Sequence, residues 1–499
     1  MESTPDRLLR IGDRRGKWVI ATTVLGSGVA MLTATVVNVA LPAIGRDLGA
    51  DISDLQWILN GYLLTLAALI LLGGSLGDRY GRRRVYVVGI VWFGVASVLC
   101  ALSPNVITLI AARALQGIGG ALLTPGSLAI IQAGFHPEDR PAAIGAWSGL
   151  TGIAAAIGPL VGGYLVDAAG WPWIFLVSAP VAAFVVWAAL RHVPESRNPA
   201  ADGPLDLPGA ILGFVGLAGV TYPIIQVSEQ GWTPLLVGVG VAGLAALAGF
   251  VWTESRSDHP MLPLGIFSSR QFTSANLVTF VVYAALGGVF FLLIVHLQTV
   301  VGYSALLAGA APLPITFLML IGSAPAGSLA QRIGPRLPLT VGPLLIAGGM
   351  LLMRRIGADA DYVITILPAM LVFGIGLTLT VAPVTATVLA AVEDHHAGVA
   401  SGVNNAVSRA AQLIAVAALP ALVGLTGADY LEPQAFAAGF RQAMLLTAVV
   451  AAAGAALAWF GIRDDVLEAA PEGEPYRHCP VDGAPYRTMS GGIEPIIDS

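Results

Sequence analysis

Long, uninterrupted apolar runs dominate this chain and predict membrane-spanning helices. A spanning helix needs about 20 mostly apolar residues, since each rises about 1.5 Å through a hydrocarbon core about 30 Å thick. Because the runs are continuous rather than alternating, they favour helices over a transmembrane barrel. The sequence therefore predicts an all-α polytopic membrane protein with 14 transmembrane helices. The runs are 18–44, 56–77, 85–103, 106–132, 143–166, 173–190, 208–227, 234–252, 273–299, 304–330, 337–356, 362–391, 398–424 and 439–461.

Composition supports the same class of protein. Of the 499 residues, 56% are hydrophobic and only 11% are charged, whereas a soluble domain carries roughly 25% charged residues. The first apolar run is too long for the core of a signal peptide, so we expect it to be a retained helix. The lipid bilayer is the first partner that the sequence predicts.

The distribution of cations predicts the orientation. Of the 25 Lys and Arg residues, 19 fall in the two tails and in the loops on the N-terminal side of the membrane. Four fall on the other side, and the remaining two, Arg113 and Arg409, lie within helices. Loops rich in Lys and Arg stay in the cytoplasm. We therefore expect a multi-pass protein of the plasma or inner membrane with both termini cytoplasmic.

A charged loop follows the second apolar run, with the sequence Gly-Ser-Leu-Gly-Asp-Arg-Tyr-Gly-Arg-Arg-Arg at 74–84. Gly81 stands where a tight turn would need a positive φ, and Asp78 can stabilise the N-terminus of a neighbouring helix. We expect this loop to act as a latch that holds the protein in a state open to the outside of the membrane, the outward-facing state. The alternative is that the loop is only a cationic anchor at the inner surface. The predicted latch residues are Gly74, Asp78, Arg79, Gly81, Arg82 and Arg83.

The fifth apolar run is rich in glycine and contains one proline. Small residues let helices approach closely in lipid, and a proline within a helix removes one backbone hydrogen bond and bends it. We expect a tightly packed, deformable helix at the interface between two bundles; the alternative is general membrane packing. Gly145 starts the pattern, which continues with Gly149, Gly152, Gly158, Pro159, Gly162 and Gly163.

Four segments together carry a family resemblance: the 74–84 loop, the run 109–117 in the fourth helix, Gly158-Pro159 in the fifth, and Thr-Val-Val-Asn-Val-Ala-Leu-Pro at 35–42. They resemble the major facilitator superfamily, and within it the fourteen-helix drug:proton antiporter group. The resemblance implies two six-helix bundles with two inserted central helices. The segment 327–336 echoes the 74–84 loop at the matching place in the second half, as expected for internally repeated transporters.

The implied division of the chain has five parts. A cytoplasmic N-terminal tail covers 1–17, and the first six-helix bundle covers 18–192. A linker with the two inserted helices covers 193–260, and the second bundle covers 261–462. The remaining residues, 463–499, are polar and rich in Pro and Gly, and we expect them to form a disordered cytoplasmic tail.

Polar residues within the apolar runs predict a central cavity. Arg113 lies inside the fourth run, with Gln116 on the same face and Gly117 next to it. An arginine at the centre of a membrane helix costs about 2.5–3.5 kcal/mol on insertion scales, so it should face a cavity or a partner. The alternatives are that these polar residues form hydrogen bonds between neighbouring helices, and that the aromatic candidate, Tyr62, lies at the membrane interface. The cavity candidates are Thr33, Asn38, Asn60, Tyr62, Asn405, Arg409 and Gln412.

No Asp or Glu lies within the fourteen runs. Many members of the resembling group carry an Asp where this chain has Thr33. We therefore hypothesise a cavity that is neutral to positive and a substrate that is a neutral or anionic amphiphile. The candidates for proton coupling are His296, whose imidazole titrates near neutral pH, and Asp78. The alternative for His296 is an interfacial side chain with one hydrogen bond.

The predicted function is export of hydrophobic or amphiphilic compounds by proton antiport through alternating access. A uniporter or importer of a small polar metabolite is the alternative; a membrane enzyme or receptor has no catalytic cluster to support it. With one lysine, Lys17, the chain has no phosphate-binding loop of the Gly-Lys type. We expect a proton gradient rather than a cofactor, and neither nucleic acid nor an obligate protein partner. His395-His396 and the His478-Cys479 pair are too weak to predict a metal site.

Overall fold

The computed structural model describes residues 8–198, 205–258, 260–393 and 397–467. Within these ranges, 14 helical segments are long and apolar enough to cross a membrane, which confirms the predicted number. The elements are α1 (Arg14–Leu48), α2 (Ile52–Tyr80), α3 (Arg82–Ala101), α4 (Val106–Gly134), α5 (Arg140–Ala169), α6 (Trp173–Leu176), α7 (Ser178–His192), α8 (Leu207–Gln230), α9 (Pro234–Arg256), η2 (Leu264–Ser268), α10 (Arg270–Thr299), α11 (Ala305–Ala310), α12 (Leu313–Ile333), α13 (Arg336–Met353), η3 (Tyr362–Ile366), α14 (Leu367–Ala390), α15 (Ala397–Leu422), η5 (Asp429–Leu431), α16 (Pro433–Gly461) and η6 (Asp464–Leu467).

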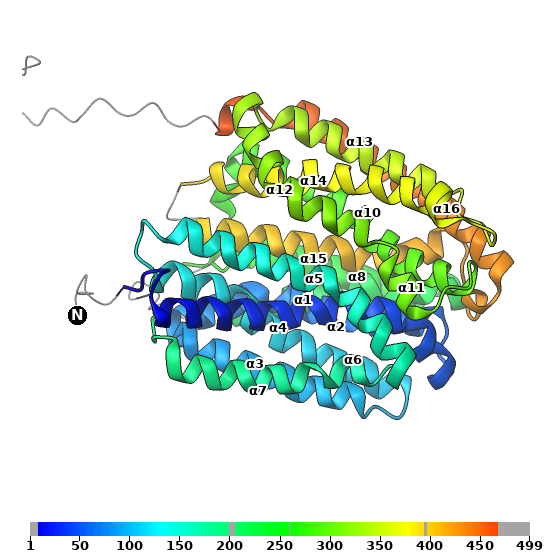
Figure 1. The fold of residues 1–499 in the computed structure, drawn as a ribbon, viewed down its shortest axis with the longest axis horizontal. Helices are drawn as coiled ribbons and strands as arrows, with labels where there is room; N and C mark the ends of the chain where they lie inside the picture. Colours follow the sequence, from blue (N-terminus) through cyan, green and yellow to red (C-terminus); the bar gives the residue numbers. More distant parts are fainter. Residues whose placement is uncertain (1–7, 199–204, 259, 394–396, 468–499) are drawn as a thin grey trace, which may run out of the picture.

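The helices form two groups that lie side by side. Helices α1–α7 pack on one another, and so do α10–α16. The inserted hairpin α8–α9 lies outside both groups, where α8 packs on α2 and α15. In Figure 1 the N-terminus marks one end of the bundle, here called the N-terminal end; the loops after α1 and α10 lie at the opposite end.

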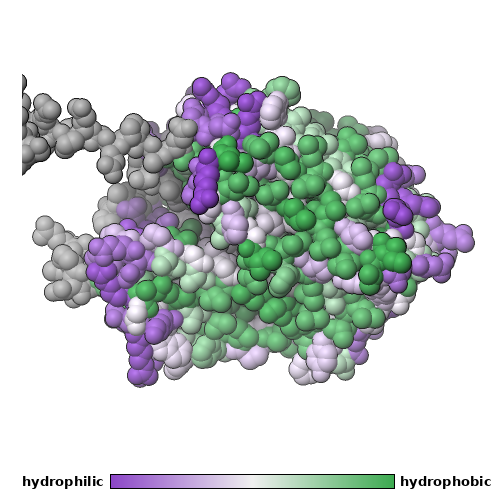
Figure 2. Space-filling model, turned by 45° about the horizontal axis from the view of Figure 1, so that its top comes forward, coloured by the Kyte–Doolittle hydropathy of each residue, from purple (hydrophilic) through white to green (hydrophobic). Residues whose placement is uncertain are grey.

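An apolar belt surrounds the middle of the molecule. Figure 2 shows hydrophobic residues across the midsection and hydrophilic residues gathered at the two ends. On α3, for example, Val88, Trp92, Val95 and Leu99 are all more than two-fifths exposed. Soluble monomers rarely expose contiguous apolar patches larger than a few hundred Å². The belt therefore fits lipid rather than water.

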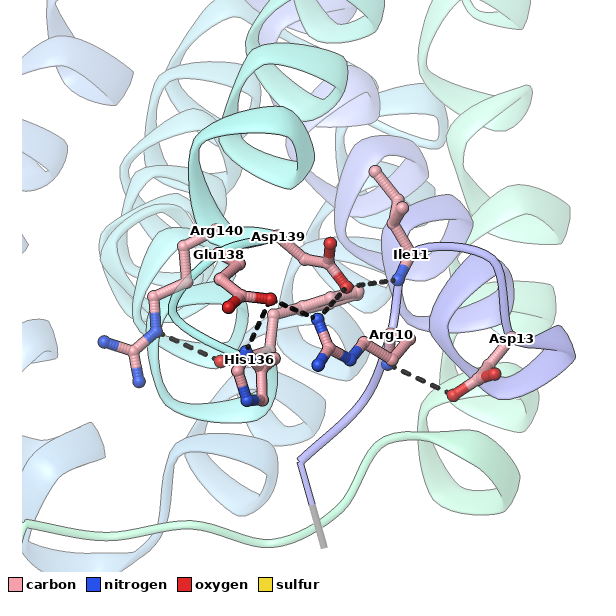
Figure 3. A network of polar contacts seen from close by, with 8 residues as sticks. Arg10, Ile11, Asp13, His136, Glu138, Asp139 and Arg140 are labelled. Atoms are coloured by element: carbon pink, nitrogen blue, oxygen red, sulfur yellow. Dashed lines mark hydrogen bonds and ion pairs between the residues drawn. The ribbon is translucent and has the colours of Figure 1, made fainter. Parts of the chain in front are cut away.

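Residues 9–11 form a clasp on the loop between α4 and α5 (Figure 3). Leu9 exchanges backbone hydrogen bonds with Gly134 and His136. The Arg10 guanidinium lies 2.9 Å from Glu138, and the Ile11 amide donates to Asp139. Because α1 begins at Arg14, the expected tail 1–17 includes a docked segment and the first residues of a helix. Of the expected C-terminal tail, 468–499 lies outside the described residues.

The clasp should weaken in acid. The hydrogen bond and charge of Arg10 hold the pKa of Glu138 below its usual range. A carboxyl with a lowered pKa stabilises above the pKa of the unfolded chain, about 4.3, and the contribution disappears as the pH falls through the folded value. We expect Glu138→Gln to speed amide exchange at residues 9–11 about two- to threefold at pH 7, a small effect because the pair is exposed. Hydrogen–deuterium exchange followed by mass spectrometry measures these rates. Equal rates in parent and variant would refute the role of Glu138.

Candidate transport site and gates

One face of α5 is closely packed at one end of the helix and has no close neighbours among the described residues at the other end. Near its C-terminal end, a Cβ on Gly163 would lie 2.4 Å from the Ala305 carbonyl oxygen, and a Cβ on Gly309 would lie 2.2 Å from that of Pro159. Gly149 and Gly152 continue the same face toward the N-terminal end, and a Cβ on either would meet nothing within 4 Å. Helix α5 thus touches the second group of helices at one end only.

The partner helix α12 shows the same gradient. Gly327, near the N-terminal end of the bundle, also has no neighbour within 4 Å of a Cβ position. Between it and Gly309, Leu320 is 53% exposed. Helices α5 and α12 therefore diverge toward the N-terminal end, and the two groups are separated there on this side.

The two groups are joined at the opposite end. The Tyr430 hydroxyl donates to the Ala50 carbonyl at 2.8 Å, and the Ile52 amide donates to Gly427 at 2.9 Å. The Asp167 carboxylate accepts from the Ala305 and Leu306 amides at 3.2 and 2.9 Å. These contacts all cross between the groups, so any state that opens this end must break them.

Arg409 lies between the groups where they meet. From α15, its guanidinium contacts Met31 of α1, with 3.5 Å between Nη2 and the sulfur, and Gln412 at 3.3 Å. None of the ion pairs found among the described residues includes Arg409. A cation without a carboxylate partner in the described chain therefore lies between α15 of one group and α1 of the other.

Comparison with known proteins decides the family. Residues 23–416 match the Major Facilitator Superfamily. The chain belongs to the major facilitator superfamily. It is 36% identical to the puromycin resistance protein pur8 of Streptomyces alboniger over 92% of this chain and 94% of that one. It is 34% identical to the tetracenomycin C resistance and export protein of Streptomyces glaucescens over 83% and 77%, and 33% identical to the methylenomycin A resistance protein of Bacillus subtilis over 88% and 93%. The resemblance that the motifs indicated is confirmed.

Solved transporters share the fold. A bacterial homologue of the lysosomal transporter Spinster, in an inward-facing and unoccupied conformation, has a TM-score of 0.63 at 19% identity, covering 92% of this chain and 100% of that one. A POT family transporter in complex with 5-aminolevulinic acid has a TM-score of 0.66 at 15% identity, covering 91% and 98%. At these identities the likeness establishes the superfamily fold alone. Because the family consists of transporters, the enzyme alternative is excluded.

Arg113 occupies a closed polar site inside the first group. It is 1% exposed; its Nε donates to the Ile58 carbonyl at 3.0 Å and its Nη1 to Gln116. The guanidinium lies 4.4 Å from the centre of the Tyr62 ring. Gly117 lets α4 approach this closely, since a Cβ there would meet the Tyr62 carbonyl oxygen at 2.4 Å. Arg113 therefore joins α2 and α4 and does not face the space between the groups.

The loop motif of the superfamily folds as the sequence suggested at Gly81, whose φ is +111°. Asp78 pairs with Arg82, the first residue of α3, at 2.7 Å, and its carbonyl accepts from Asn198. Arg83 donates to Val193. All of these partners come before α8 in the chain. These contacts therefore hold the loop within the N-terminal half of the protein. Of the remaining predicted latch residues, the Arg79 guanidinium lies 5.6 Å from the Tyr80 ring centre and Gly74 faces Pro125.

The predicted antiporter residues divide into two sets. Gly158 and Gly162 pack on α1, where a Cβ would lie 2.3 Å from Thr35 Oγ1 and 2.6 Å from Val36 Cγ1. Together with Pro159 and Gly163 they form close contacts. Gly149 and Gly152 do not, which departs from the expectation of tight packing along the whole helix. The physical reason is the divergence of α5 and α12.

Several cavity candidates lie elsewhere than expected. Thr33 is fully buried against α7, where its hydroxyl lies 3.2 Å from that of Ser178. Asn60 is buried one turn from Gln56, which donates to two carbonyls of α15, and neither polar atom of Asn60 has a partner in the described chain. Asn38 and Asn405 donate to carbonyls of their own helices. Among the candidates, Arg409 and Gln412 contact each other, whereas Tyr62 packs on Arg113 inside the first group.

His296 lies deep inside the second group. Its Nε2 is 2.9 Å from the Ile356 carbonyl, and its ring stacks on Phe440 with 3.9 Å between ring centres. Nδ1 has no partner among the described residues. The side chain is fully buried rather than interfacial, because α16 supplies aromatic rings on which it packs. His296 and Asp78 are far apart in the fold, in different halves.

Sequence reasoning missed a buried acid within a helix. Helix α9 extends to Arg256, beyond the run 234–252, and Glu254 is 2% exposed within it. The expectation that the helices contain no buried carboxylate is corrected by this residue. The signal was present in the chain, because Asp206 stands two residues before the run 208–227 and Glu254 stands two residues after the run 234–252. A hairpin of these two runs brings both acids to the same end.

Proposed function

We propose that this protein exports hydrophobic or amphiphilic compounds from the cell by proton antiport through alternating access. The observation that carries the proposal is the arrangement of the two groups of helices, which touch at one end and diverge along α5 and α12 at the other. Relatives named for puromycin resistance and for tetracenomycin C resistance and export support the direction of transport.

The cationic residues support an orientation with both termini in the cytoplasm. The divergent end of α5 and α12 then faces the cytoplasm, and a compound enters from there. Arg409, which has no carboxylate partner in the described chain, favours a neutral or anionic amphiphile over a cationic one, since opposite charges attract strongly where water is scarce. A proton gradient supplies the energy, and no cofactor is required.

Transport by inverted membrane vesicles with an imposed pH gradient tests the function. We expect gradient-dependent uptake of a neutral and an anionic aromatic amphiphile, weaker uptake of puromycin, and no uptake of a dicationic dye. Loss of uptake when the gradient is collapsed identifies proton coupling. Strong transport of the dication would refute the argument from charge, and uptake only of a small polar metabolite would replace export with the importer alternative.

A further inference from the structure

A pair of acids lies in the inserted hairpin, outside the space between the two groups. Helix α9 is largely exposed, and its buried residues are Leu236, Gly243 and Glu254. Glu254 is 2% exposed, and Asp206, which precedes α8, is 8% exposed. The two carboxyls lie within side-chain hydrogen-bonding reach of each other. Burying a charge is costly unless it is paired, so two carboxylates in contact need a cation.

One oxygen of each carboxyl is already used. Asp206 Oδ1 accepts from the Gly209 amide at 2.8 Å, which caps α8. Glu254 Oε2 accepts from the Leu262 amide at 3.0 Å, which holds the linker toward η2 against α9. The other two oxygens, Asp206 Oδ2 and Glu254 Oε1, are buried and have no partner in the described chain. A single proton between them satisfies both, since a protonated carboxyl donates and an ionised one accepts.

Among the described residues, no basic side chain forms an ion pair with either carboxyl. The groups that contact the Glu254 carboxyl are the Asp206 side chain and the Leu262 and Met261 backbone amides. Arg256, two residues further on, lies over the Trp252 ring, 4.9 Å from its centre. Asp258, on the linker, is exposed and acidic. His259 lies outside the described residues.

We propose that Asp206 and Glu254 share one proton and form a proton-binding site in the α8–α9 hairpin. The bound proton joins the two helices and keeps Glu254 oriented toward the Leu262 amide. When the proton leaves, two adjacent buried carboxylates repel each other, and the linker at 261–262 loosens. The site is independent of the proposed export, since it requires neither a substrate nor a gradient.

Infrared difference spectroscopy of the purified full-length protein in lipid nanodiscs tests the proposal. At pH 7 in potassium buffer, the parent should show one carbonyl band of a protonated carboxylic acid that is lost in both Glu254→Gln and Asp206→Asn. Glu138→Gln, which changes an exposed acid at the same end of the bundle, should retain it. Raising the pH should remove the band in the parent and speed amide exchange at 261–262. In Glu254→Gln that exchange should not depend on ionisation, because the amide side chain donates to Asp206 at every pH.

Three outcomes would overturn the proposal. One is a parent spectrum identical to those of both variants at pH 7. Another is a band that disappears when sodium replaces potassium at constant pH and ionic strength, which would identify a metal-ion site. The third is a rise in linker exchange with pH that is equal in parent and Glu254→Gln. If one variant fails to fold, the other gives the same comparison, since each removes one partner of the same proton.

Discussion

Gly163→Val is expected to open the end of the molecule that is closed in this structure. A Cβ at Gly163 would lie 2.4 Å from the Ala305 oxygen and 2.6 Å from the Leu306 Cα. Both atoms belong to the backbone of the other half, so neither can move aside as a side chain would. Overpacking of this kind costs about 1–3 kcal/mol, which shifts an equilibrium between two states by about 5- to 150-fold.

Gly149→Val should act in the opposite direction. Gly149 lies on the same face of α5, but a Cβ there meets nothing within 4 Å. The valine is therefore tolerated in this state and obstructs α12 when the two helices converge. We expect Gly149→Val to hold the structure described here, and both variants to reduce transport about tenfold or more.

Spin labels placed in pairs across the two halves, one pair at each end, measure the distances. Gly163→Val should lengthen the distance at the closed end and shorten it at the N-terminal end, whereas Gly149→Val should change neither in the resting protein. Gly238→Val is the control, because Gly238 lies on the exposed helix α9 with no atom within 4 Å. A Gly163→Val protein with parental distances and parental transport would show that the contact with α11 is not a gate.

The sequence predicts the helices well because lipid imposes one rule on all of them. Every backbone group must be paired within the membrane, so a run of sufficient length becomes a helix whatever its neighbours are. In the part of the chain that it describes, the structure accordingly has 14 such segments. The turn at Gly81 follows as directly, because a positive φ favours glycine. Both the helices and this turn are determined by short stretches of sequence, and for that reason they can be predicted without knowledge of the neighbouring helices.

The faces of the helices could not be predicted as reliably. In a soluble helix, polar residues mark the exposed side, but in lipid the exposed side is as apolar as the buried one. Thr33 therefore resembled a cavity residue, although it pairs with Ser178. The end of α9 could not be predicted either. Glu254 lies two residues beyond the predicted run, and it is buried beside Asp206, which is 48 positions earlier in the chain.

Alanine at Arg113 and at Arg409 should have opposite consequences. In the sequence the two residues are alike, since each is an arginine within an apolar run. In the structure, Arg113 is 1% exposed and holds α2 against α4. Arg113→Ala leaves the Gln116 side-chain oxygen without its donor, which costs about 1–3 kcal/mol for an unsatisfied buried group. It also removes the bond that ties α4 to the Ile58 carbonyl, and it creates a cavity. We expect a loss of about 3 kcal/mol or more in stability, measured as a lower unfolding temperature in detergent.

Arg409→Ala should fold as the parent does and transport differently. Arg409 is half-buried, and its contacts are the Met31 sulfur and Gln412 of its own helix, so few groups lose a partner. A hydrogen bond to a charged group contributes about 1.5–3 kcal/mol, so its loss should lower uptake of the anionic amphiphile at least about tenfold and affect the neutral one less. Arg409→Lys keeps the charge and should retain part of the uptake. If Arg113→Ala is as stable as the parent and loses uptake selectively, whereas Arg409→Ala does not, then Arg113 is the residue that faces the substrate, and the site must form in a state other than this one.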